Sequence, residues 1–262
     1  MFKLLEIEFR KLIPYRAFWV AVLAYALLMP GLFISLHKLN INVQNFSLGI
    51  NFYNFPDVWH NNTYIASWFN VLLYFFMILV VSNEYQFRTV RQNVIDGLSR
   101  FQVLGSKMLL MLVFSMASTV LVAGVSLLCG MFLAEEGFRE VSWEKIEYVG
   151  LYFVQILGFM SFALLVTTVF RKQGMSIIVF IGYTLIGENI LRYLIFPKLH
   201  LPFDLGAYLP FQNIGKLIPN PLPAYFGLME PPVFQQELMV TSLGYVLLFL
   251  VASVGVLYRR DL

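Results

Sequence analysis

Charged residues are scarce in this sequence. Only 13% of its 262 residues are Asp, Glu, Lys or Arg, whereas 59% are hydrophobic. A water-soluble domain of this length has about a quarter of its residues charged, so this chain lacks the polar surface that would cover a core in water. The surplus of apolar side chains excludes a soluble globular protein and indicates one that faces lipid.

Other absences exclude whole classes of function. The single cysteine, Cys129, rules out an intrachain disulfide and a cluster of thiolate metal ligands. The formal net charge of +3 is too small to indicate nucleic-acid binding. No Gly-x-x-x-x-Gly-Lys-Ser/Thr phosphate loop occurs, and the histidines form no His-Glu-x-x-His motif. The chain is therefore expected to be no enzyme and to hold no ATP or other cofactor itself.

Long apolar runs are what the sequence has instead. A helix needs about 20 mostly apolar residues to cross the ~30 Å hydrocarbon core of a bilayer. Six runs meet this condition, and the lack of strict alternation favours helices over barrel strands. The predicted spans are residues 17–36, 64–81, 108–133, 148–170, 175–195 and 238–258. We therefore expect an all-α integral membrane protein with a single transmembrane domain over residues 1–262.

Basic residues orient these spans. Most of the 18 lysines and arginines lie before the first span, between the second and third, between the fourth and fifth, and after the last. Cytoplasmic loops carry an excess of Lys and Arg. The chain is therefore predicted to be a multi-pass protein of the cell inner membrane with both termini in the cytoplasm.

Residues 1–15 are predicted to form an amphipathic helix at the membrane interface. Phe2, Leu5 and Phe9 share one helical face, and charged side chains occupy most of the remaining circumference. This pattern is typical of helices that lie in the plane of the interface. The alternative is a frayed, solvated tail.

Residues 82–107 are predicted to form a short helical hairpin in the cytoplasm. Glu84 and Arg88 have the spacing of a favourable helical ion pair, which would continue the second span beyond the bilayer. Asp96-Gly97 is a turn signal, and Ser99 can cap a new helix. Apolar side chains among the basic ones favour a docking surface for a soluble partner. The alternative is an ordinary basic loop that only sets the topology.

Residues 196–237, before the last span, contain most of the chain's 11 prolines together with many apolar side chains. The segment is too apolar for a flexible linker and too interrupted by proline for a full span. It is predicted to form external re-entrant helices that dip into the outer leaflet.

Glu188 is the one acidic residue within a predicted span, and Asn189 follows it. An intramembrane carboxylate is a functional candidate, so both residues are candidates for a translocation pathway. The alternative is a structural Glu188–Arg192 ion pair near the outer interface, with Arg192 extending to water.

The loop after the second span resembles that of ATP-binding-cassette permeases of the type-2 exporter family, which is also called ABCG-like or type V. The positions that carry the resemblance are Glu84, Thr89, Arg91, Ser99, Arg100 and Lys107. Arg88 stands where the family usually has glycine. The six spans, the N-terminal surface helix and the long external segment agree with the family's layout. The loop is also similar to that of permeases from Bacteroidota-type bacteria.

The resemblance implies a membrane permease subunit of an exporter, which forms the substrate pathway as a dimer. The implied partners are ABC ATP-binding subunits that hold ATP and Mg, a second copy or a related permease, membrane lipids and, as a further option, accessory subunits. The implied coupling helix lies in residues 82–107. The residues implied to couple to the ATPase are Glu84, Arg88, Thr89, Arg91, Asp96, Ser99 and Arg100.

Two other functions remain open. A stand-alone secondary transporter or channel could use Glu188 as a proton or ion site. A membrane-embedded enzyme is disfavoured because no acid, base or metal cluster converges within the predicted spans.

Overall fold

The structure is a computed structural model that describes residues 2–36, 42–43, 46–47, 52–195, 205–228, 230 and 235–259. Apart from a small antiparallel pair of strands, β1 (Asn42–Val43) and β2 (Phe46–Ser47), the regular structure within these residues is helical. It includes six helices that are long and apolar enough to cross a membrane. The prediction of a multi-pass all-α protein with six helices of membrane-spanning length is confirmed.

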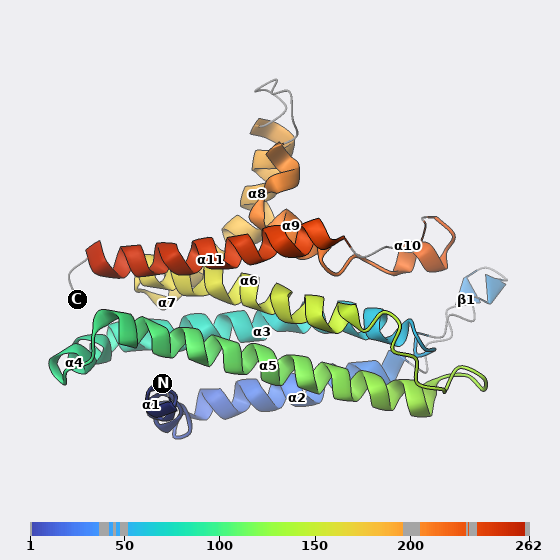
Figure 1. Ribbon diagram of the computed structural model, residues 1–262, viewed down its shortest axis with the longest axis horizontal. Coiled ribbons are helices and arrows are strands. Elements are labelled where there is room, and N and C mark those ends of the chain that lie inside the picture. Colours follow the sequence, from blue (N-terminus) through green and yellow to red (C-terminus); the bar gives the residue numbers. More distant parts are fainter. Residues whose placement is uncertain are drawn as a thin grey trace.

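Five long helices lie side by side along the longest axis of the molecule (Figure 1). They are α2 (Arg16–Leu36), α3 (Val58–Gln86), α5 (Arg100–Leu133), α6 (Glu147–Phe170) and α11 (Gln236–Arg259). Helix α6 is central, since it contacts α3, α5 and α11 and is the most buried of the six spans. Helices α3 and α5 extend beyond the predicted spans, which begin at residues 64 and 108.

The fifth span in chain order, predicted as a continuous helix over 175–195, changes its hydrogen bonding along its length. Regular helix α7 (Gln173–Ile181) is followed by π-helix η1 (Gly182–Gly187), one turn of α8 (Glu188–Ile190) and π-helix η2 (Leu191–Ile195). In Figure 1 the α8 segment projects away from the parallel bundle. This span is the least buried of the six.

Short helices complete the fold. They are α1 (Phe2–Leu12), α4 (Thr89–Ile95), the 3₁₀-helix η4 (Leu205–Tyr208), α9 (Pro210–Lys216) and α10 (Leu222–Tyr225). Figure 1 shows α1 nearly end-on, so it runs across the direction of the long helices. Of the predicted re-entrant segment 196–237, residues 196–204, 229 and 231–234 lie outside the described part of the chain.

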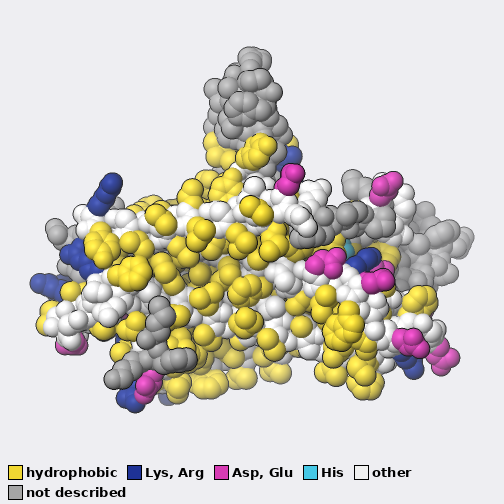
Figure 2. Space-filling view, viewed as in Figure 1, with side chains coloured by type: hydrophobic (Ala, Val, Ile, Leu, Met, Phe, Trp, Pro, Cys, Tyr) yellow, Lys and Arg dark blue, Asp and Glu magenta, His cyan; other side chains and the backbone are white. Residues whose placement is uncertain are grey.

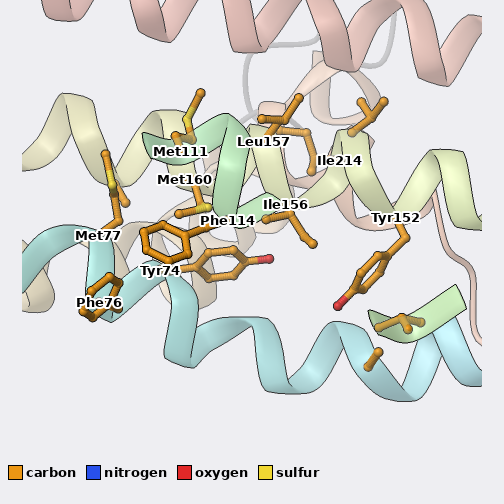
Figure 3. Close-up of a cluster of buried hydrophobic side chains, with 14 of the residues drawn as sticks. Tyr74, Phe76, Met77, Met111, Phe114, Tyr152, Ile156, Leu157, Met160 and Ile214 are labelled. Atoms are coloured by element: carbon orange, nitrogen blue, oxygen red, sulfur yellow. The ribbon is translucent and has the colours of Figure 1, made fainter. Parts of the chain in front are cut away.

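The core forms where α3, α5, α6 and α9 meet (Figure 3). The labelled side chains are Tyr74, Phe76, Met77, Met111, Phe114, Tyr152, Ile156, Leu157, Met160 and Ile214. Helix α9 approaches α6 closely because Gly158 has no side chain. A Cβ atom at that position would lie 2.8 Å from Cδ1 of Ile214. This contact places the short helix α9 directly on the bundle.

The two ends of the bundle differ in charge. Lysine and arginine gather at the end that carries α1, α4 and the last turn of α11, whereas acidic side chains are more frequent at the other end (Figure 2). We call the first the basic end and the second the acidic end. The surface between them is largely apolar in this view, as expected for contact with lipid.

Candidate functional site

A helical hairpin projects from the basic end, between α3 and α5. Helix α3 ends at Gln86, and Arg88 then adopts a left-handed backbone with φ 56° before α4 begins. Gly97, with φ 100°, turns the chain after α4. Left-handed conformations end helices, so the chain reverses within a few residues. The turn predicted at Asp96-Gly97 is present, whereas the helix before it ends at Gln86 and does not continue through Arg88.

Ser99 caps the N-terminus of α5, as predicted. Its hydroxyl accepts a hydrogen bond from the backbone N–H of Gln102, at 3.2 Å. The side chain of Gln102 accepts one in return from the N–H of Ser99, at 2.8 Å. This reciprocal arrangement, a capping box, satisfies two N–H groups that a helix start leaves without partners. It fixes the point at which the hairpin returns to the bundle.

The predicted pair between Glu84 and Arg88 is wrong. Arg88 leaves the α-helical conformation, which removes the geometry that brings residues four apart together. Glu84 is only 6% exposed and faces the bundle. Its Oε1 atom lies 2.8 Å from Nζ of Lys11 on α1 and 2.7 Å from Nζ of Lys107 on α5. Glu84 therefore connects three helices.

Glu8 completes this arrangement, and we call Glu8, Lys11, Glu84 and Lys107 the ionic cluster. Glu8 is 2% exposed and forms an ion pair with Lys107, which is 3% exposed. The hydroxyl of Ser106 donates a hydrogen bond of 2.8 Å to Oε1 of Glu8. Two carboxylates and two ammonium groups balance in charge, which is the condition under which buried charges are tolerated.

Sequence reasoning missed Glu8 and Lys11 as members of a site. They occupy the charged face of an amphipathic helix, and that pattern predicts exposure to water rather than an inward contact. The burial of Glu84, which only the structure shows, is what requires a nearby cation such as Lys11.

The other predicted coupling residues are distributed around the hairpin. The hydroxyl of Thr89 donates to the backbone oxygen of Glu84, at 3.3 Å. Asp96 follows the last residue of α4. Arg91 is exposed on α4. Arg100 points elsewhere, because its guanidinium donates to the backbone oxygens of Leu257 and Tyr258 in the last turn of α11. It thereby ties the hairpin to the final span.

A cleft of about 540 Å³ opens beside the hairpin, at the basic end. It lies between the end of α3, helix α4 and the turn that joins α6 to α7. Its lining residues are Glu84, Tyr85, Arg88, Val90, Arg91, Phe170, Arg171 and Lys172. The guanidinium of Arg171 lies over the ring of Tyr85, 5.3 Å from the centroid. The lining is predominantly basic.

The carboxylate of Glu188 caps the N-terminus of α9 in this structure. Its two carboxylate oxygens accept hydrogen bonds of 2.9 Å from the backbone N–H groups of Phe211 and Gln212, at the start of α9. No Glu188–Arg192 ion pair forms in the described part of the chain, so that expectation is wrong. Arg192 instead donates to the side-chain oxygen of Gln212, at 2.8 Å. Asn189 donates to the backbone oxygen of Leu185.

A second polar group lies within the bundle. Tyr25 on α2, Asn70 on α3, Ser118 on α5 and Tyr152 on α6 are all buried. The hydroxyl of Tyr25 lies 2.6 Å from that of Ser118 and 2.7 Å from that of Tyr152. The Tyr152 hydroxyl also donates to Oδ1 of Asn70, at 2.7 Å. One hydrogen-bonded group thus joins four spans.

The acidic end carries a smaller cavity of about 140 Å³, lined in part by His60, Asn61 and Tyr225. The side-chain amide of Asn61 donates to the Tyr225 hydroxyl at 2.6 Å, and burial raises the pKa of Tyr225 to about 12. His60, expected outside the spans, lies in the first turn of α3 and stacks on Tyr148. Among the described residues, no group of three or more His, Cys, Asp or Glu side chains is arranged to hold a metal ion.

Comparison with known proteins gives one family. The model of a family described as "Protein of unknown function (DUF2705)" matches residues 20–262, which includes nearly all of the first span and the five that follow. Helix α1, with Glu8 and Lys11, precedes the matched region. No curated protein matches the chain.

Proposed function

The chain belongs to the DUF2705 family, and we propose that it is the membrane-spanning permease subunit of an ATP-binding-cassette exporter. It pairs with a second copy or a related permease, and the substrate pathway runs between the two. Separate ATPase subunits bind and hydrolyse ATP with Mg. This chain carries out no hydrolysis and transmits movement.

The observation that carries this proposal is the hairpin resting on the ionic cluster. A force on α4 is transmitted to α3 and α5 through the backbone, and to α1 through the ion pairs of Glu84 and Lys107. Breaking a buried ion pair by removing one partner costs about 3–5 kcal/mol. The connection is therefore stiff enough for closure of a partner to tilt the bundle.

The outer surface of the hairpin suits contact with a soluble protein. Phe87 is 69% exposed and Ile95 is 72% exposed, and both flank the exposed Arg91. Apolar side chains with an arginine among them are typical of interface centres. In this proposal the coupling helix is α4, with Arg91 and Asp96 facing the ATPase and Glu84, Thr89 and Ser99 holding its shape.

The charge distribution supports a cytoplasmic location for the basic end in the cell inner membrane. The orientation of α1 across the bundle agrees with a helix lying in the interface. At the acidic end, α9 buries Phe211 and Ile214 and contacts α6 and α11. These contacts favour the interpretation of the preceding segment as re-entrant helices covered by protein.

The contacts of Glu188 favour the exporter over a transporter that uses this residue for ions. Both of its oxygens are occupied by backbone N–H groups of α9, whereas an ion site needs an accessible oxygen. Asn189 is exposed on the same segment. In this proposal Glu188 and Asn189 affect the substrate pathway only indirectly, because Glu188 holds α9 in position.

Co-purification tests the proposal. The protein is expressed together with a tagged candidate ATP-binding-cassette subunit from the same organism, and the complex is isolated in detergent. The ATPase is expected to bind wild type and the matched control Arg10→Glu, which changes an exposed arginine on α1. Arg91→Glu is expected to reduce binding about tenfold or more, as for an interface hot spot. Equal binding by all three proteins would remove α4 from the coupling role.

A further inference from the structure

The basic cleft beside α4 retains its positive charge. Within the described residues, Arg88, Arg91 and Lys172 form no ion pair, although all three line the cleft. The one acid in the lining, Glu84, already contacts two lysines of the ionic cluster through Oε1. The exposed cations of the cleft give it a net positive charge, which attracts an anion.

Two arginines of the cleft have an unfavourable backbone conformation. Arg88 has φ 56° and Arg171 has φ 57°. A side chain with a Cβ atom is strained in this region, whereas glycine adopts it freely. Helix ends usually place glycine in this conformation, so an arginine at each of these two positions is retained at a conformational cost. The ring of Tyr85 beneath the Arg171 guanidinium holds that side chain in a defined direction.

The cleft lies where the spans end. Helix α3 ends at Gln86 and α6 at Phe170, whereas the predicted spans end at residues 81 and 170, so the cleft is expected at or just beyond the lipid head groups. Phe170 and Val90 add an apolar wall to the basic lining. A volume of about 540 Å³ is within the range of small-ligand sites. Basic pockets between spans on the cytoplasmic side are suited to anionic phospholipids.

We propose that this cleft binds the phosphodiester head group of an anionic membrane lipid. Arg88, Arg171 and Lys172 contact the phosphate oxygens, and the acyl chains extend past Phe170 into the bilayer. The site does not depend on the exporter function, since it requires only the cleft and its depth in the membrane.

Lipid binding to the purified protein tests this site. Dioleoylphosphatidylglycerol is titrated into protein in mixed micelles with dioleoylphosphatidylcholine, and bound lipid is counted by native mass spectrometry. Arg88→Gly and Arg171→Gly are each expected to lower the affinity for phosphatidylglycerol about fivefold. Because glycine removes the backbone strain, the thermal midpoint in phosphatidylcholine alone is expected to stay equal or rise.

Lys145→Gly is the matched control. Lys145 is another non-glycine residue with positive φ, at 63°, but it lies near the acidic end and pairs with Asp57. Its substitution is expected to leave phosphatidylglycerol binding unchanged. The proposal is overturned if inorganic phosphate displaces the lipid at comparable concentration, since the site would then serve a soluble anion. It is also overturned if both arginine variants bind phosphatidylglycerol as tightly as wild type, because the cleft would then not hold the head group.

Discussion

Nζ of Lys11 on α1 lies 2.8 Å from Oε1 of Glu84 on α3, although the two residues are 73 positions apart in the chain. The contact joins a helix that crosses the bundle to one that runs along it (Figure 1). Together with Lys107 it makes the N-terminal helix part of the folded domain rather than an independent membrane anchor.

Lys107→Met is expected to destabilise the protein by about 3–5 kcal/mol, because Glu8 and Glu84 would then share Lys11 alone in a buried site. Thermal unfolding in detergent measures the effect. Arg10→Ala, which removes only an exposed pair with Glu6, is expected to change stability by less than about 0.5 kcal/mol.

The double change Glu8→Gln with Lys107→Met separates charge balance from loss of packing. It leaves Glu84 with Lys11, so it is expected to be more stable than Lys107→Met alone. An unfolding temperature for Lys107→Met equal to that of wild type would show that the ionic cluster contributes nothing to the fold.

Gly158→Ala is expected to destabilise the protein by about 1–3 kcal/mol, because the added Cβ overlaps Ile214 of α9. Adding Ile214→Val to this change removes the nearest atom and is expected to restore part of the loss. Gly150→Ala on the same helix meets no atom within 4 Å and serves as the control. Thermal unfolding of wild type and these three variants checks the contact. A Gly158→Ala protein as stable as the control would place α9 elsewhere.

Substitutions of Glu188 are expected to have different effects in an exporter subunit and in a stand-alone transporter. Glu188→Leu removes both acceptors at the start of α9 and is expected to destabilise the protein by about 1–3 kcal/mol. Glu188→Gln keeps one acceptor oxygen and, if the chain is an exporter subunit, is expected to retain substrate-dependent ATPase activity in the reconstituted complex. Ion- or pH-dependent flux by the chain alone, abolished in Glu188→Gln, would instead establish the transporter.

Single cysteines test the orientation. With Cys129→Ala as the background, Phe87→Cys is placed on the hairpin and Phe138→Cys at the acidic end, and both positions are exposed. An impermeant maleimide added to intact spheroplasts is expected to label Phe138→Cys and to label Phe87→Cys only after lysis. The opposite pattern would invert the topology and remove the coupling role of α4.

The elements of this fold follow mostly from local sequence. Six apolar runs predicted six helices of membrane-spanning length. Gly97 and Ser99 predicted the turn after α4 and the start of α5, because caps and turns depend on a few neighbouring residues. The predicted helix lengths agreed less well with the structure. Polar residues such as His60 extend α3 past its apolar run, since the protein rather than lipid surrounds them.

The partners of charged residues did not follow from sequence. The spacing of Glu84 and Arg88 predicted an ion pair between them. The left-handed turn at Arg88 prevents that pair, and Glu84 instead contacts Lys11 and Lys107, which are distant in the chain. Glu188 was likewise assigned to Arg192, whereas the start of α9 attracts its carboxylate. Such pairings depend on how elements far apart in the chain pack, which periodicity does not report.

The hydrogen-bonded group of Tyr25, Asn70, Ser118 and Tyr152 limits how this subunit can move. A passage opening between α2, α3, α5 and α6 would break several buried hydrogen bonds at once. In the proposed exporter, these four spans are therefore expected to change orientation as a single body. Spin labels placed within one chain are then expected to keep constant separations while ATP is hydrolysed by the partner, and large displacements are expected only between the two proposed permease copies.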